Sequence, residues 1–144
     1  MEVKKVKKIF VVLFMLIMCS LLYACKSKEN VDDVEITYGE SELFSDSEIE
    51  NAVDAIKEKF KDFEGCELIK IWYDEGKSKL EAERYLTKEN GMKKENIIIF
   101  YSDFKVDSSG KNPVLNPDST YTDWMWILTR EDITKDWTVK DWGY

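Results

Sequence analysis

NIIIFYSDFKV, residues 96–106, is the stretch that predicts the fold most directly. It is rich in β-branched and aromatic residues, which indicates a strand. Residues 97–101 are apolar at every position, and so are residues 124–128 in a second such stretch, YTDWMWILTR at 121–130. A strand with one face in water would alternate apolar and polar residues. We therefore expect the middle of the sheet to be covered on both faces.

The rest of the chain after residue 44 predicts two helices and two further strands. Ser45 and Glu48 form a capping box, apolar residues then recur at helical spacing, and Gly65 ends this helix. A strand at 67–74, a second helix at 78–89 and a last strand at 137–142 complete the pattern. This order indicates an α+β fold, with a long N-terminal helix packed on a curved antiparallel sheet of about four strands. The second helix falls between strands one and two.

The two helices can cover one face of this sheet, which leaves the other face without a predicted element. Three alternatives follow: the sheet curls around its own core, a second subunit packs on it, or a ligand fills the gap. Trp72, Tyr101, Trp124 and Trp126 are the candidate aromatics for ligand stacking or a subunit interface, although aromatic residues on strands also suit a core. Alternation places Tyr121 and Met125 on the face opposite Trp124 and Trp126.

The first 25 residues have the parts of a secretory signal. Lysines at 4–8 precede an apolar run from Ile9 to Leu22, which is shorter than the roughly 20 residues of a membrane-spanning helix. Leu22-Tyr23-Ala24-Cys25 resembles the lipobox of bacterial lipoproteins. This resemblance implies a signal peptide at 1–24, a lipid such as palmitate on Cys25, and a location at the extracytoplasmic face of the cell membrane.

Residues 26–43 are polar and acidic and have no sustained period. We interpret 25–43 as a flexible tether, with a root-mean-square reach of roughly 25 Å, and 44–144 as the folded domain. Cys19 lies in the signal and Cys25 carries the lipid, so Cys66 alone keeps a thiol. We expect Cys66 to be a small buried hydrophobe.

The composition excludes several classes of function. A net charge of −8 argues against nucleic acid as a partner. The chain has no histidine, which excludes Ser–His and Cys–His nucleophile pairs and histidine-dependent metal sites. Ser109 and Lys111 stand where a calcium loop starting at Asp107 would place acidic ligands. We therefore expect no metal and no cofactor.

Three segments, IIIFYSDFKVDSSG, NPDSTYTDWMWILTRED and WTVKDWGY, resemble a group of uncharacterised small lipoproteins of Gram-positive bacteria. The order of elements is similar to that of NTF2-like and cystatin-like domains, in which a curved sheet wraps a long helix. This likeness implies a homodimer through the sheet face and a small-molecule site at the mouth of the cone.

Two hypotheses about function follow. The first is a lipid-anchored domain that binds a protein, a small molecule or a cell-wall fragment, with no catalytic residue. The second, implied by the likeness to NTF2-like isomerases, is an isomerase or hydrolase that uses Asp103, Asp123 or Asp141 beside tyrosine or tryptophan donors. Binding is favoured over catalysis, because strand carboxylates usually lie at a rim or a turn.

Overall fold

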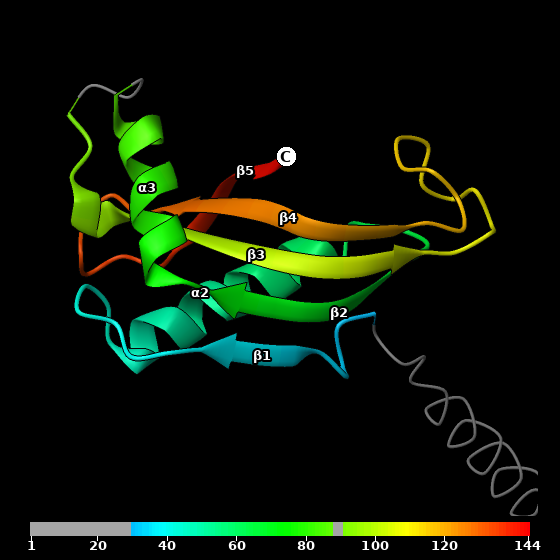
Figure 1. Cartoon of the computed structure of the whole chain (residues 1–144), viewed down its shortest axis with the longest axis horizontal. Helices are drawn as coiled ribbons and strands as arrows, with labels where there is room; N and C mark the ends of the chain where they lie inside the picture. Colours follow the sequence, from blue (N-terminus) through cyan, green and yellow to red (C-terminus); the bar gives the residue numbers. More distant parts are fainter. Residues whose placement is uncertain (1–29, 88–90) are drawn as a thin grey trace, which may run out of the picture.

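The computed structural model describes residues 30–87 and 91–144, in which a mixed sheet carries one helix on each face (Figure 1). The predicted signal sequence and Cys25 lie outside the described residues. The elements are β1 (Glu35–Tyr38), α2 (Asp46–Phe60), β2 (Cys66–Tyr73), α3 (Glu75–Leu86), the 3-10 helix η1 (Lys94–Asn96), β3 (Ile97–Val106), β4 (Thr120–Thr129) and β5 (Thr138–Gly143).

The strands lie in sequence order, from β1 at one edge to β5 at the other. β1 runs parallel to β2, and the remaining neighbours are antiparallel. Figure 1 shows α3 in front of the sheet, crossing the strands near one end, and α2 behind it. The main core lies between α2 and the sheet.

The apolar run Ile97–Tyr101 lies in β3, the middle strand. Ile98 and Phe100 are fully buried in the core under α2, whereas Ile99 packs with Ala82 of α3 on the opposite face. The expectation that both faces are covered here is confirmed. One helix covers each face: α2 lies on one and α3 on the other. At this end of the sheet, neither a curled sheet, nor a second subunit, nor a ligand is needed to cover the second face.

The capping box at the start of α2 is also confirmed. The Glu48 carboxylate accepts a hydrogen bond from the Ser45 N–H at 2.9 Å, and the Ser45 hydroxyl accepts one from the Glu48 N–H at 3.4 Å. These two bonds satisfy backbone donors that a helix start leaves open. They fix the register of the apolar stripe that α2 buries.

The expected architecture is wrong in helix length, strand number and strand direction. α2 has 15 residues and ends at Phe60, well before Gly65, because the Phe63 N–H donates to the Phe60 carbonyl in a tighter turn. The sheet has five strands rather than about four, and it is mixed rather than antiparallel. The long helix wrapped by an antiparallel sheet, which the likeness to NTF2-like and cystatin-like domains implied, is not observed.

The second helix also differs from the prediction. α3 begins at Glu75, because the Asp74 side chain accepts a hydrogen bond from the Lys77 N–H at 2.8 Å and caps the helix there. The predicted start at residue 78 took residues 75–78 for a turn. With β1 added to the sheet, α3 lies between the second and third strands.

The domain boundary lies earlier than Phe44. Val31 is 6% exposed in the core, and β1 pairs with β2 from Glu35 to Tyr38. The Glu42 N–H donates to the Glu75 carboxylate at 2.9 Å. Residues 30–43 therefore belong to the fold, and the interpretation of all of 25–43 as a tether is wrong for this part.

Two bulges flank Asp103 on the strands to either side of β3. The register shifts between Leu68 and Lys70 on β2, and β4 has an extra residue opposite Asp103. At the second bulge Asp123 adopts φ 55°, and its N–H donates to Asp103 Oδ1 at 3.1 Å. The extra residue turns Tyr121 to the α2 face, the same face as Trp124 and Trp126. Simple alternation had placed Tyr121 on the opposite face, and that expectation is wrong.

Candidate functional site

The four candidate aromatics divide between the two faces of the sheet. Trp126 is fully buried under α2, and its indole N–H donates to the Ser102 hydroxyl at 2.8 Å. Trp124 is 9% exposed in the same core. Both residues therefore serve as core, and the structure does not bring them to Trp72 and Tyr101.

Trp72 and Tyr101 meet on the opposite face of the sheet, which we call the outer face. Their rings stack with centroids 5.9 Å apart and an angle of 25° between the planes. Met125 pairs with Tyr101 in the register of β3 and β4 and packs in the same cluster. We call Trp72, Tyr101 and Met125 the outer-face patch.

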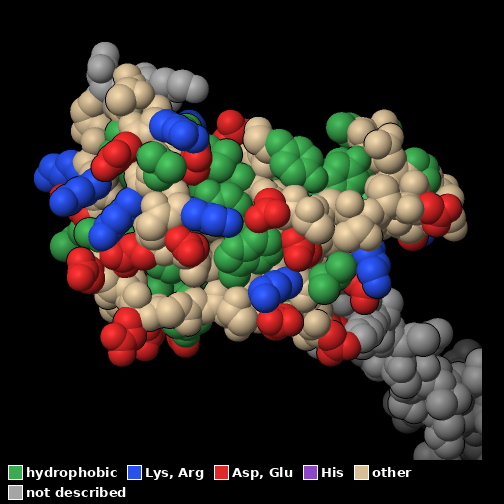
Figure 2. Space-filling view, viewed as in Figure 1, with side chains coloured by type: hydrophobic (Ala, Val, Ile, Leu, Met, Phe, Trp, Pro, Cys, Tyr) green, Lys and Arg blue, Asp and Glu red, His purple; other side chains and the backbone are tan. Residues whose placement is uncertain are grey.

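α3 leaves this patch partly open. The helix packs on Ile97, Ile99 and Ile127 toward one end of the outer face. Beside it, Trp72 and Met125 are half-buried. Figure 2 shows apolar side chains in the middle of this face, bordered by acidic and basic ones. The outer face is thus covered at one end and open beside α3.

Two lysines lie over the patch. Lys70 Nζ is 6.0 Å from the ring centroid of Trp72, and Lys77 Nζ is 5.5 Å from that of Tyr101. Lys77 also reaches the Asp123 carboxylate at 3.9 Å. Burial raises the pKa of the Tyr101 hydroxyl, and neighbouring carboxylates raise it further. The hydroxyl therefore stays protonated at neutral pH and can donate a hydrogen bond.

The strand carboxylates do not form a catalytic pair. Asp123 and Asp141 are exposed and Asp103 is half-buried. Asp103 accepts its hydrogen bond from the Asp123 backbone, within the bulge. None of the three is the buried carboxylate beside a tyrosine or tryptophan donor that the isomerase or hydrolase hypothesis requires.

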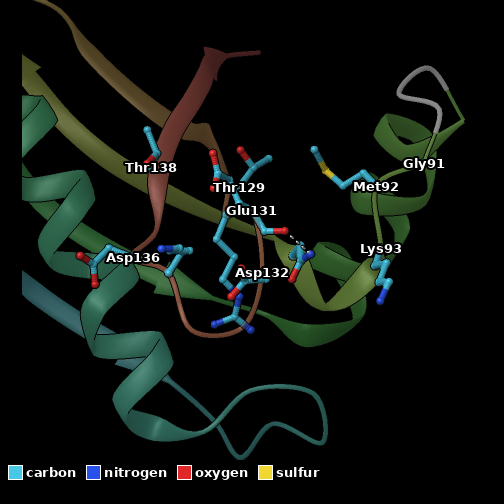
Figure 3. Close-up of a pocket in the computed structure, with 11 residues that line it drawn as sticks. Gly91, Met92, Lys93, Thr129, Glu131, Asp132, Asp136 and Thr138 are labelled. Atoms are coloured by element: carbon cyan, nitrogen blue, oxygen red, sulfur yellow. Dashed lines mark hydrogen bonds between the residues drawn. The ribbon is translucent and has the colours of Figure 1, made fainter.

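A recess, which we call the distal groove, lies between β4, β5 and the segment before η1 (Figure 3). Figure 3 shows Met92 and Lys93 on one side of it and Thr129, Glu131 and Thr138 on the other. The volume of the groove is about 740 Å³. Its lining includes Gly91, Met92, Lys93, Asn96, Thr129, Arg130, Glu131, Asp132, Lys135, Asp136 and Thr138.

Asn96 is the most informative residue of the distal groove. It is 7% exposed, and its Nδ2 donates to the Glu131 carbonyl at 3.1 Å. Its Oδ1 atom is buried and has no hydrogen-bond partner. A buried acceptor without a partner is costly, and a bound donor can satisfy it. No sequence pattern predicts this groove, because segments far apart in the chain form it.

Arg130 lies beneath the groove and has a structural role. Its guanidinium is 2.8 Å from the Glu48 carboxylate, donates to the Glu95 carbonyl, and lies 4.3 Å from the centroid of the Trp137 ring. Burial disfavours the charged Glu48 carboxylate, but hydrogen bonds from Ser45 and Arg130 outweigh it and lower the pKa of Glu48. This pair joins the start of α2 to the end of β4.

Residues 30–87 and 91–144 contain neither a cluster of three metal-binding side chains nor a helix long and apolar enough to cross a membrane. The chain has no significant match among known protein families, curated proteins or solved structures.

Proposed function

We propose that this chain is a lipid-anchored, extracytoplasmic interaction domain that binds a partner protein through the outer-face patch. Leu22-Tyr23-Ala24-Cys25 supports the anchor, which would be a lipid on the Cys25 sulfur. The observation that carries the binding role is the half-buried Trp72 ring, which stacks on the buried Tyr101 on a sheet face beside α3.

The composition of the patch supports a protein partner. Tyrosine, tryptophan and methionine are enriched at the centres of protein interfaces, and charged residues lie at their rims. Here Trp72, Tyr101 and Met125 form the centre, while Lys70 and Lys77 border it.

The shape of the outer face supports a partner segment that lies beside α3. The helix already packs on this face at one end, with its axis across the strands (Figure 1). A second helix packs about 8–10 Å from a first one. An amphipathic partner helix parallel to α3 would cover the row of strands that carries the patch, as in other helix-in-groove complexes.

A homodimer through the sheet face was the partner expected from the sequence. In two copies anchored in one membrane, the same end of each sheet faces the lipid. The α3 helices of the two copies would then oppose each other and hold the two patches apart. We therefore propose a different protein as the partner.

Photocrosslinking in cells tests this proposal. The photoreactive residue p-benzoyl-phenylalanine replaces Trp72, and in a control chain it replaces Trp142, the exposed tryptophan on the α2 face. The expected result is an adduct from position 72 that Met125→Asp abolishes and that position 142 does not give. An adduct of twice the chain mass would show a homodimer. Equal labelling at both positions would contradict a role for the patch.

Asn96 supports a second candidate function, the binding of a small polar ligand in the distal groove. Peptidoglycan fragments released by a muramidase are the probe. We expect them to shift the amide resonances of Thr129 and Thr138 in the groove and to leave Thr37, on β1, unchanged. Shifts spread equally over all three threonines would contradict a site in the groove.

The anchor has its own test. Globomycin, which blocks the lipoprotein signal peptidase, should make the full-length precursor accumulate. Cys25→Ser should give the same unprocessed chain without the drug. A mobility on gels that neither treatment changes would contradict lipidation of Cys25.

A further inference from the structure

We infer that a recess on the α2 face binds one neutral pyranose ring, either a free sugar or the terminal ring of a glycan. We call it the aromatic recess, and its lining includes Lys59, Asp62, Phe63, Val114, Trp124 and Trp142. It shares no residue with the outer-face patch or the distal groove. The inference is independent of the lipid at Cys25. Because the occupant is a sugar, no protein adduct is expected at position 142.

Segments far apart in the chain form the aromatic recess. Lys59 lies in the last turn of α2, and Phe63 lies in the tight turn that follows the helix. Val114 comes from the connection between β3 and β4, while Trp124 and Trp142 come from β4 and β5. The fold, and not a local motif, therefore brings these side chains together.

The recess has a buried aromatic floor and an open aromatic wall. Phe63 and Trp124 are 8% and 9% exposed, whereas Trp142 is 41% exposed. The Phe63 ring lies 6.5 Å from that of Trp124 at an angle of 89°, and 6.2 Å from that of Trp142 at 62°. The volume is about 210 Å³. Sites for drug-sized ligands have roughly 300–1,000 Å³, so this recess suits a single small ring.

The charged groups at the recess form a balanced pair. Lys59 Nζ is 2.9 Å from Asp62 Oδ2 and 4.7 Å from the centroid of the Trp142 ring. Because the two charges cancel, the recess favours a neutral ligand over an ion. The pair still offers ammonium donors and carboxylate acceptors. The indole N–H of Trp124 is buried and has no hydrogen-bond partner among the described residues, so the floor lacks an acceptor.

A pyranose ring matches both the apolar and the polar part of this lining. Its C–H groups form an apolar face that packs on an indole ring, and its hydroxyls donate and accept hydrogen bonds. One hydroxyl can donate to Asp62 while its neighbour accepts from Lys59. A flat aromatic ligand would stack on Trp142 but offer the ion pair no such partners. An acyclic polyol has the hydroxyls without the rigid apolar face.

NMR titration of the whole chain tests the site. The chain is used as the cell produces it, in a detergent without a sugar headgroup, so that no other sugar competes. The probes are glucose, galactose, N-acetylglucosamine and their methyl glycosides, and the acyclic polyol sorbitol is the control. We expect at least one sugar to shift the indole N–H resonances of Trp142 and Trp124 saturably. The indole of Trp72 and the amide of Thr129 report on the other two surfaces and should not shift.

Substitutions assign the binding to the aromatic recess. Trp142→Ala removes the open ring and should abolish the saturable shift of Trp124. Asp62→Ala removes an exposed hydrogen-bonding carboxylate and should weaken binding roughly tenfold. The matched control is Glu58→Ala, which removes the partner of Lys61 at 2.8 Å near the same end of α2, outside the recess. This control should leave the affinity unchanged.

Four results would overturn the inference: no shift with any sugar, an equal shift with sorbitol, equal loss of affinity in Asp62→Ala and Glu58→Ala, or shifts at Thr129 without shifts at Trp142. Two results would support it and identify the source of the ring. Methyl glycosides that bind as tightly as the free sugars would indicate the end of a glycan. Binding of the free sugars alone would indicate a monosaccharide.

Discussion

Ser102 and Trp126 form the buried polar pair at the centre of the core. Both side chains are fully buried, and the indole N–H has the Ser102 hydroxyl as its hydrogen-bond partner. We expect Ser102→Ala to leave this donor unsatisfied and to lower the free energy of unfolding by about 1–3 kcal/mol. Urea unfolding measures the change, and Ser108→Ala, at an exposed loop serine, is the control. Equal stability of the two variants would contradict the role of the bond.

Cys66 illustrates how burial decides the chemistry of a thiol. It is 5% exposed, as expected from the sequence. Burial raises the pKa of the thiol, and the Asp107 charge raises it further, against a hydrogen bond from Asn112 that lowers it. We therefore expect slow reaction with Ellman's reagent at neutral pH in the folded protein and fast reaction in urea. Fast reaction without denaturant would show a reactive cysteine.

The link between the 39–44 segment and α3 depends on Glu75. A hydrogen bond from Lys79 is the main cause that lowers the pKa of Glu75 to about 2, and the backbone N–H of Glu42 contributes as well. Carboxyl titration by NMR should find this value in the folded protein. Lys79→Met should raise the pKa of Glu75. An unchanged titration in the variant would contradict the assignment of the cause to Lys79.

The Glu48–Arg130 pair links α2 to β4 and makes stability depend on pH. The pKa of Glu48 is lowered in the folded state, so the stabilisation is present above its ordinary value of 4.5 and is lost as pH falls through the lowered value. Unfolding in urea between neutral and acidic pH should therefore show a smaller loss of stability on acidification in Glu48→Gln than in the original chain. A steeper loss in the variant would contradict this sign.

Most elements could be predicted from the sequence because each carries a local signal. The capping box placed α2, and the apolar runs placed β3 and β4. β1 is harder to predict, because its four mostly exposed residues at a sheet edge show little alternation of apolar and polar side chains. The length of α2 was overestimated because Phe63 continues its apolar spacing beyond the last helical turn, from within a non-helical turn.

The bulges beside Asp103 are a further feature that alternation along one strand cannot show. The Tyr121 ring packs on Phe104 at 5.1 Å under α2, although strict alternation placed Tyr121 on the other face. A bulge depends on pairing between strands, and one strand's own sequence does not contain that pairing. Predictions of side-chain faces therefore held for residues 124–128 and failed before the bulge.

At the scale of the molecule, the structure separates the four candidate aromatics into two pairs. Trp72 stacks on the buried Tyr101 on the outer face, but the division of the helices between the faces put Trp124 and Trp126 in the core under α2. That division depends on tertiary packing, which helical periodicity does not encode. The distal groove was missed altogether because it forms where separate loops meet.

The two ends of the sheet differ in the roles we propose. In the orientation that the proposed anchor implies, Asn30 marks the end nearest the lipid, while the distal groove opens at the other end. The outer-face patch lies between them, on the side of the domain. In this orientation the patch faces along the membrane, toward other membrane-bound proteins, and the groove faces away from it.

The lipid on Cys25 is the central claim, because both the location and the orientation depend on it. The most direct measurement is the intact mass of the chain extracted from membranes of the producing bacterium. The account predicts a chain that begins at Cys25 and carries a diacylglyceryl group on its sulfur. A membrane-extracted chain that retains residues 1–24, or one that begins elsewhere and carries no lipid, would contradict it.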